Sequence, residues 1–194
     1  MSREYFGKDL EAMSFAPNYH QWILHEFAPY IGEDIVEVGA GTGNFSELLL
    51  NTQHRRKLVA LEPSANMFAE LEKRLAGIPN AEAKSAFFGD CGYRDSLDTV
   101  FYINVLEHIE NDAQELLYVR DSLKSGGYIC LFVPALTYLY SNLDKKIGHF
   151  RRYHKQSLAD LMTASGFKLI DIKYFDMAGI LPWYVAFVLF KYEA

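Results

Sequence analysis

The feature that most constrains this chain is a glycine-rich turn between two apolar segments. Residues 35–38 form a short, mostly apolar run that is typical of a buried strand. Gly39, Gly41 and Gly43 follow at alternate positions, and residues 45–50 then have the composition of a short helix. Glycine permits positive φ and lets a ligand approach the backbone closely. The turn therefore delivers free N–H groups at a helix N-terminus, which is a natural site for a carboxylate or a phosphate.

A second apolar strand, expected over residues 57–61, follows this turn and ends at Glu62. An acidic residue about 20 positions after a glycine-rich strand–helix turn can hydrogen-bond a ribose diol. The glycine spacing is G-x-G-x-G, whereas dinucleotide-binding proteins have G-x-G-x-x-G/A. Glu37 lies two residues before Gly39, where it would repel a pyrophosphate but suits the cationic end of an aminoacyl group. The pattern indicates an adenosine-type ligand.

The segment V-E-V-G-A-G-T-G, together with Glu62, resembles motif I of the class I S-adenosylmethionine-dependent methyltransferases. The resemblance covers roughly residues 17–175 and is strongest to methyltransferases of types 11 and 12, including those of ubiquinone biosynthesis. It implies a Rossmann-like α/β fold, which is a three-layer sandwich with a mainly parallel sheet and helices on both faces. It also implies S-adenosylmethionine as the cofactor and methylation as the reaction of this transferase.

The resemblance also assigns the cofactor contacts. Met67 lies one turn into an expected helix, where family members place an apolar residue against the adenine; a core methionine is the alternative. Asp90 either accepts a hydrogen bond from the adenine amino group or forms an Asx turn. The segment N-V-L-E-H-I resembles a family motif whose first residue faces the methionine part of the cofactor. The expected cofactor-binding residues are Glu37, Gly39, Ala40, Gly41, Gly43, Glu62, Pro63, Met67, Asp90, Asn104 and Val105.

Periodicity and capping signals give the other elements. We expect helices over 17–30, 44–51, 65–76, 111–122 and 157–166, and strands over 35–38, 57–61, 81–88, 97–103, 128–133 and 167–175. A full family domain closes with an antiparallel last strand, for which this chain has no clear counterpart.

At 194 residues the chain is expected to form one domain. Residues 1–16 are interpreted as a leader or lid. Residues 135–156 break the periodicity after an expected strand, and we interpret them as an acceptor-binding insert. Its segment D-K-x-I-G-H-F-R-R-Y resembles one in bacterial methyltransferases that are often met beside glycosyltransferases. The candidate acceptor-binding residues are Tyr138, Asp144, Arg151, Arg152 and Tyr153. The arginines suit a bidentate carboxylate or phosphate clamp, with surface charge pairing as the alternative.

Methyl transfer from a sulfonium is an in-line displacement, so the protein mainly has to align the acceptor and exclude water. A general base helps with a hydroxyl or ammonium acceptor, and the candidate catalytic residues are His108 and His149. Some relatives bind a divalent metal with the Glu and His of this segment, but Asn104 stands here in place of a further acid, so no metal is expected. The predicted function is O- or N-methylation of a sugar-, lipid- or quinone-related small molecule.

Composition restricts the partners and the compartment. The formal net charge of −6 argues against nucleic acid as the main partner. Cys91 and Cys130 match no zinc spacing and fit a reduced, cytoplasmic setting. No signal peptide is recognised, and the apolar run 180–190 is too short to span a bilayer. The apolar C-terminal segment, residues 178–194, could still contact a lipid surface peripherally or a partner.

Two other functions stay open at this point. One is a methyltransferase-like domain that binds cofactor or a partner without turnover. The other is a nicotinamide-dependent oxidoreductase, against which the glycine spacing and Glu37 both count.

Overall fold

The computed structural model describes residues 17–52, 57–175 and 180–190. These residues divide into two compact units. The first consists of the described residues up to Ile103 together with Asp121–Phe132, and the second of Asn104–Arg120 with the described residues from Val133 on. The expected leader, residues 1–16, lies outside the described residues, and the organisation as a single domain stays a prediction.

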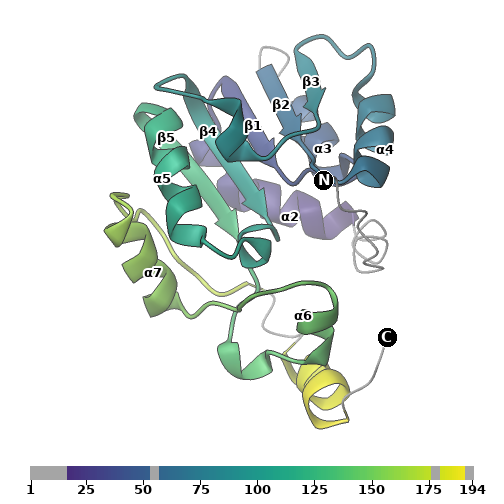
Figure 1. Cartoon of the computed structure of the whole chain (residues 1–194), viewed down its shortest axis with the longest axis vertical. Coiled ribbons are helices and arrows are strands. Elements are labelled where there is room, and N and C mark those ends of the chain that lie inside the picture. Colours follow the sequence, from purple (N-terminus) through teal and green to yellow (C-terminus); the bar gives the residue numbers. More distant parts are fainter. Residues whose placement is uncertain (1–16, 53–56, 176–179, 191–194) are drawn as a thin grey trace. The chain divides into compact units, whose positions relative to one another are not determined.

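The first unit contains a five-stranded parallel sheet with strand order β3-β2-β1-β4-β5 (Figure 1). In its centre, Val36 pairs with Val59 on one side and with Val100 on the other. The expected α/β fold with a mainly parallel sheet is confirmed. The strands are β1 (Asp34–Val38), β2 (Lys57–Leu61), β3 (Ala81–Lys84), β4 (Leu97–Ile103) and β5 (Leu123–Phe132).

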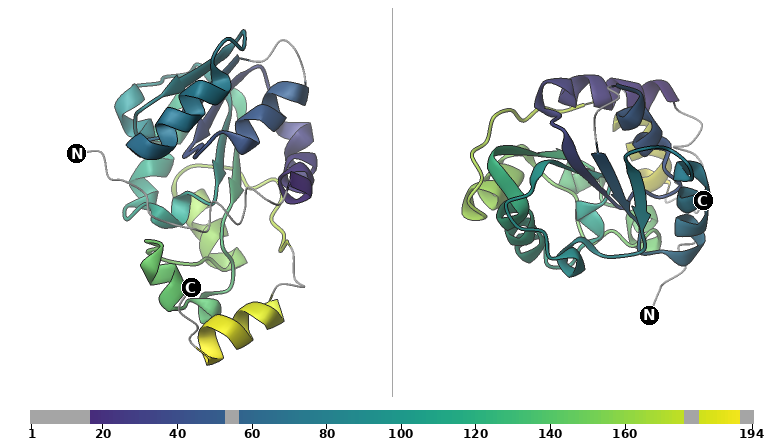
Figure 2. Two further views of the ribbon diagram at one scale, coloured as in Figure 1. Left: turned by 90° about the vertical axis from the view of Figure 1, so that its right-hand side faces the viewer. Right: turned by 90° about the horizontal axis from the view of Figure 1, so that it is seen from above.

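Helices flank this twisted sheet (Figure 2). Phe27 of one helix and Phe45 of another both pack edge-on against Phe101 of β4, with ring centroids 6.0 and 5.7 Å away. These two helices therefore cover the same face of the sheet. A third helix buries Leu71 in a cluster with Ala60 of β2. In order, the helices are α2 (Pro17–Phe27), which continues as the 3-10 turn Ala28–Tyr30, α3 (Asn44–Thr52) and α4 (Ala65–Leu75).

A polar cluster joins the amino ends of three adjacent strands. The ammonium of Lys124 on β5 lies 2.7 Å from Asp34 Oδ2 on β1 and 2.9 Å from Asp98 Oδ1 on β4. The other Asp98 oxygen accepts the backbone N–H of Asp34 at 2.9 Å. The sheet is thus cross-linked by side chains at the edge opposite the glycine turn, which follows the carboxyl end of β1.

The second unit consists of short helices and connecting segments. Within the described ranges, no helix is both long and apolar enough to cross a membrane. The elements of the second unit are the 3-10 turn Leu106–His108, α5 (Asp112–Ser122), the 3-10 turn Thr137–Leu139, α6 (Asn142–Lys146), α7 (Lys155–Ala164), α8 (Ile180–Trp183) and the π-helical segment Tyr184–Leu189. The last two residues of α5 belong to the first unit.

Two of the strand predictions are wrong. The strand expected over 81–88 ends at Lys84, because the N–H of Ala86 turns back to donate to the carbonyl of Lys84 at 3.1 Å. Residues 167–175 form no strand. Their apolar composition indicated one, but composition supplies no neighbouring strand for the backbone to pair with, and Ile170 is exposed.

Two element starts also differ from expectation. The last predicted helix begins at Lys155 rather than Ser157, because His154 is its N-cap and donates its backbone N–H to Ser157 Oγ at 3.1 Å. Strand β5 begins at Leu123, and the expected glycine turn is a register shift within it, since Leu97 pairs with Leu123 and Thr99 with Tyr128.

Candidate functional site

The glycine turn after β1 has the backbone geometry that its sequence predicts. The φ angles of Gly39, Gly41 and Gly43 are 67°, 56° and 85°, which is the left-handed region that side chains disfavour. A Cβ on Gly43 would lie 2.8 Å from Leu71 Cδ1 of α4. The backbone angle therefore favours glycine at position 43, and a Cβ there would also force the Leu71 side chain of α4 to shift.

The carboxylate of Glu62 is held by the backbone of two turns. Its Oε2 accepts the N–H of Gly41 at 2.9 Å, and its Oε1 accepts the N–H of Ser64 at 2.8 Å. The side chain is buried at the carboxyl end of β2. Each oxygen retains a second lone pair, so the carboxylate can also accept hydrogen bonds from a ligand diol.

Glu37 is a second buried carboxyl beside the turn. The hydroxyl of Ser46, on α3, donates a hydrogen bond to its Oε2. Burial, and to a lesser extent the charge of Glu62, raise the pKa of Glu37 to about 8 against the effect of this hydrogen bond. The positive charge of a ligand ammonium group would offset the cost of ionising this buried carboxyl. The two acids therefore fit a ligand with both a diol and an ammonium, and S-adenosylmethionine has both.

The other predicted cofactor residues have varied surroundings. Ala40 is buried and donates its N–H to the carbonyl of Leu61 at 2.9 Å. Pro63 and Met67 are half-buried between β2 and the first turn of α4, and Asp90 is exposed on the 3-10 turn Phe88–Cys91. Asn104, with φ 53°, and Val105 directly follow β4 and belong to the second unit. The cofactor roles of all these residues stay predictions.

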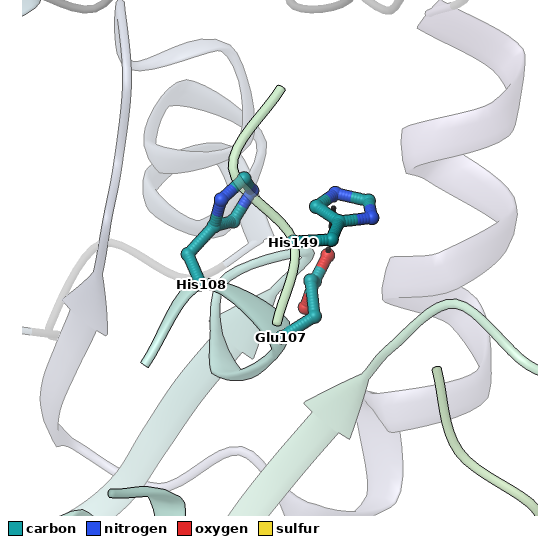
Figure 3. Close-up of side chains that lie close together, drawn as sticks. All are labelled: Glu107, His108 and His149. Carbon is teal, nitrogen blue, oxygen red and sulfur yellow. Dashed lines mark ion pairs between the residues drawn. The ribbon is translucent and has the colours of Figure 1, made fainter. Parts of the chain in front are cut away.

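The two candidate catalytic histidines lie together in the second unit. The rings of His108 and His149 meet edge-on, with centroids 4.6 Å apart. Beside them, Glu107 is fully buried, and its Oε1 lies 3.8 Å from His149 Nε2 (Figure 3). One ligand atom from each of the three residues lies within 4.8 Å of the others.

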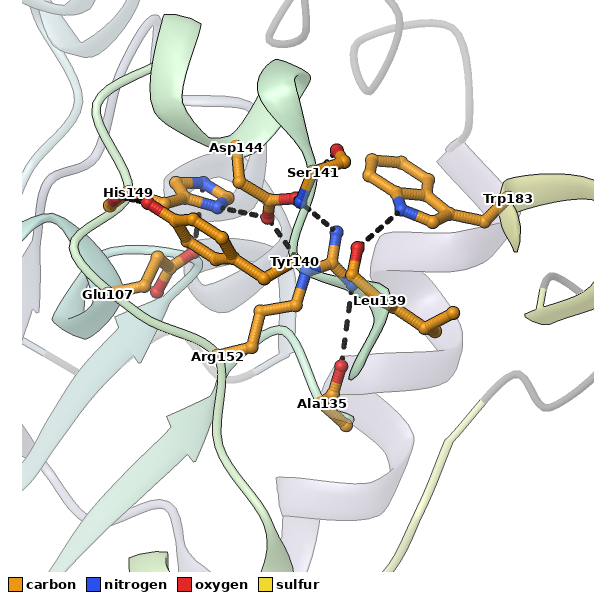
Figure 4. A network of polar contacts seen from close by, with 9 residues as sticks. All are labelled: Glu107, Ala135, Leu139, Tyr140, Ser141, Asp144, His149, Arg152 and Trp183. Atoms are coloured by element: carbon orange, nitrogen blue, oxygen red, sulfur yellow. Dashed lines mark hydrogen bonds and ion pairs between the residues drawn. The ribbon is translucent and has the colours of Figure 1, made fainter. Parts of the chain in front are cut away.

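Asp144 forms the centre of a polar network in the insert (Figure 4). Its fully buried carboxylate accepts hydrogen bonds from Arg152 Nε at 2.7 Å, His149 Nδ1 at 2.9 Å and the Ser141 backbone N–H at 2.8 Å. Burial by itself would raise the pKa of Asp144, but the hydrogen bonds from His149 and Arg152 hold it at about 2. Asp144 is therefore ionised and faces inward.

The two arginines of the insert also make internal contacts. Arg152 lies over the ring of Trp183, 4.6 Å from its centroid. Arg151 pairs with Asp112 at 2.7 Å, and the buried Tyr153 donates its hydroxyl to the same carboxylate at 2.9 Å. This is the charge pairing that the sequence left open as the alternative to an acceptor clamp.

Tyr138, another acceptor candidate, is 56% exposed. The acceptor roles of Tyr138, Asp144, Arg151, Arg152 and Tyr153 stay predictions. Sequence reasoning did not identify Ser46 or Asp112 as partners in these sites. The available signal for Ser46 was its position in the first turn of the helix that begins at residue 44, directly after the glycine turn.

Comparison with known proteins finds methyltransferases among the similar sequences. Residues 36–129 match the family model described as a methyltransferase domain. A tRNA U34 carboxymethyltransferase of Shewanella putrefaciens is 30% identical over 113 residues, which are 56% of this chain and 33% of that protein. A trans-aconitate 2-methyltransferase of Acidovorax is 30% identical over 111 residues, 57% of this chain and 40% of that protein. The matches thus span 33% to 40% of the length of these curated relatives.

Among solved structures, a SAM-dependent methyltransferase of Leishmania major superposes with a TM-score of 0.71 at 16% identity. The match covers 87% of this chain and 70% of that one. At this identity the likeness concerns the fold alone, and it agrees with the parallel sheet and flanking helices described above.

Proposed function

Since this chain belongs to the class I S-adenosylmethionine-dependent methyltransferase family, we propose that it methylates an oxygen or nitrogen atom of a small-molecule acceptor. The observation that carries the proposal is the position of Glu62. Its carboxylate is fixed by the N–H groups of Gly41 and Ser64, next to the buried carboxyl of Glu37.

The bound cofactor would supply a methyl group on a sulfonium; the S–CH₃ bond breaks as the acceptor–CH₃ bond forms, and the acceptor loses a proton. The chain has to hold the donor and exclude water. In this proposal Glu62 accepts hydrogen bonds from the ribose hydroxyls, and Glu37 forms an ion pair with the ammonium group of the cofactor. The glycines keep side chains out of the cofactor's path along the turn.

The proton of the acceptor requires a base when the acceptor is a hydroxyl or an ammonium. His149 is supported as the candidate by its contact with Asp144 at 2.9 Å, because an ionised partner orients an imidazole and stabilises its protonated form. His108 lies against it. We propose one of these two imidazoles as the proton acceptor.

The acceptor is proposed to be a small sugar-, lipid- or quinone-related molecule. One relative is named for tRNA and another for trans-aconitate. The formal net charge of −6 favours a small acceptor over tRNA, because nucleic-acid binding depends on neutralising phosphates. A domain that binds cofactor without turnover is the second candidate, favoured by the internal pairing of Arg151 and Arg152.

The test is calorimetric titration of the full chain with S-adenosylmethionine, S-adenosylhomocysteine and NAD. We expect S-adenosylmethionine and S-adenosylhomocysteine both to bind. The Glu62→Ala substitution should weaken their binding free energy by about 1–3 kcal/mol through the loss of charge-assisted hydrogen bonds. Glu72→Ala, an exposed acid on α4, is the matched control. Absence of binding to folded protein would refute the proposal. Binding without methyl transfer to hydroxyl, amine or carboxylate acceptors would favour the silent domain.

A further inference from the structure

Three metal-ligating side chains converge within the second unit (Figure 3). Glu107 and His108 belong to one 3-10 turn, and His149 comes from the insert. One ligand atom from each lies within 4.8 Å of the other two. No metal was expected from the sequence, because Asn104 stands in place of a further acid, but in the structure the third group is a histidine from a distant part of the chain.

The spacing is close to that of a preformed ion site. Two ligands bound at about 2.0–2.1 Å to a tetrahedral zinc ion lie about 3.3 Å from each other. His149 Nε2 is already 3.8 Å from Glu107 Oε1. That separation is too long for a hydrogen bond. Side-chain movements of about 1.5 Å or less would bring all three ligand atoms onto one ion.

Asp144 directs the correct nitrogen of His149 toward this position. The ionised carboxylate can only accept, so the 2.9 Å contact places the imidazole hydrogen on Nδ1. Nε2 is therefore the nitrogen that is left to coordinate an ion, and it faces Glu107 (Figure 4). Carboxylates orient metal-binding histidines in this way.

The charges of the neighbouring side chains also favour a cation. Arg152 binds Asp144 with two of its nitrogens, at 2.7 and 3.2 Å, and so balances that carboxylate. Glu107, whose side chain is fully buried, adds a second carboxyl group to this region. Burying a carboxylate is costly, and coordination to a metal ion would offset that cost.

We propose that Glu107, His108 and His149 bind a divalent transition-metal ion of the zinc and cobalt type, with Asp144 as the residue that positions His149. Two imidazoles and one carboxylate suit these ions, whereas magnesium and calcium favour oxygen ligands. Three protein ligands leave a coordination position open. This role rests on the proposed function and changes one part of it, because a metal-bound His149 has no nitrogen left to act as the base. The open position would take an acceptor hydroxyl and lower its pKa, so that water accepts the proton and oxygen is the methylated atom.

The first experiment titrates chelator-treated full chain with Co²⁺ and records the visible d–d absorption. We expect saturation at one equivalent and displacement by Zn²⁺. X-ray absorption at the zinc edge of the loaded wild type should show imidazole ligands, which requires no variant. A chain without saturable absorption overturns the inference, since Glu107 and His149 would then form an ion pair only.

Variants locate the ion. Glu107→Gln and His149→Ala are each expected to weaken Co²⁺ binding about tenfold or more, whereas His25→Ala, which removes an exposed histidine of α2, should not change it. Circular dichroism checks that each variant is folded. Unchanged binding in folded Glu107→Gln and His149→Ala would place the ion elsewhere and contradict the inference.

The two proposals fail separately. Titration with S-adenosylhomocysteine in the presence of a chelator tests the cofactor site alone, and Co²⁺ titration without cofactor tests the metal site alone. Cofactor binding without Co²⁺ binding overturns the metal site and leaves the proposed function intact. Co²⁺ binding without cofactor binding does the reverse.

Discussion

Glu62 Oε2 accepts the backbone N–H of Gly41 at 2.9 Å, although 21 positions of chain separate the two residues. The acid that ends β2 thus also closes the glycine turn after β1. Residues that sequence patterns treat as two independent signals form one hydrogen-bonded unit, and a change at either residue disturbs both the turn and the ligand site.

Glu62→Gln should separate these two roles. The amide oxygen can still accept one backbone N–H, but the amide no longer carries the charge that strengthens hydrogen bonds to ligand hydroxyls. We expect S-adenosylhomocysteine to bind about tenfold more weakly, with a melting temperature closer to wild type than that of Glu62→Ala. Calorimetry and thermal unfolding measure the two quantities. Equal affinities of the glutamine variant and wild type would argue against a ribose contact.

Glu37→Gln should stabilise the ligand-free chain at alkaline pH. The pKa of Glu37 is about 8 in the folded chain, against an ordinary 4.5. Between these values the folded chain holds a proton that the unfolded chain has lost, so stability falls as the pH rises through this window. The variant should remove this dependence and gain up to about 5 kcal/mol above pH 8. Denaturant unfolding at pH 6 and pH 9 tests this, and a wild type equally stable at both would contradict it.

The same carboxyl makes cofactor affinity depend on pH. If the ligand ammonium binds the ionised form of Glu37, wild-type affinity should fall by about tenfold for each pH unit below 8. The Glu37→Gln variant should bind the cofactor weakly, with an affinity that does not change with pH in this range. Titration of S-adenosylhomocysteine between pH 6 and pH 9 measures both, and parallel curves for wild type and variant would rule out the contact.

Gly43→Ala should destabilise the chain more than Gly77→Ala. Both glycines have positive φ, at 85° and 77°, so both substitutions incur backbone strain of about 1–3 kcal/mol. A Cβ on Gly43 would also lie 2.8 Å from Leu71, whereas the space around Gly77 is open to 4 Å. The difference between the two variants in unfolding free energy gives the cost of the contact with Leu71. If both variants lose the same stability, α4 moves away from the added Cβ without a measurable cost.

Asp144→Ala should disrupt the insert. It leaves Arg152 buried without its carboxylate, and breaking a buried pair costs about 3–5 kcal/mol. Because Arg152 lies over Trp183, the fluorescence of that residue should change as well. Asp160→Ala, which removes an exposed acid on α7, is the control.

The pH dependence of wild type is a further check on Asp144. Its pKa of about 2 lies below the ordinary 3.8. Its contribution to stability is therefore complete above pH 4 and should disappear as the pH falls toward 2. An Asp144→Ala variant as stable as wild type at pH 7 would contradict this account.

Local signals accounted for much of the fold. The bounds of β2 and β4 agree with expectation, because short apolar runs with turn residues on either side are strong strand signals. The strand expected over 167–175 failed because pairing depends on a neighbour that the segment itself does not contain. The same holds for the sites. The glycine turn was readable, whereas the approach of His149 to Glu107 and the enclosure of Asp144 by Arg152 depend on how the insert folds.

The cluster of Lys124 with Asp34 and Asp98 has a consequence for how this protein can diversify. It secures the amino ends of β1, β4 and β5, whereas the glycine turn and Glu62 follow the carboxyl ends of β1 and β2. The ion pairs that hold the strands together and the residues proposed to bind ligand thus lie at opposite edges of one sheet. Loops at the carboxyl edge can be exchanged during evolution while the anchored edge remains intact, so a new specificity need not begin with a less stable protein.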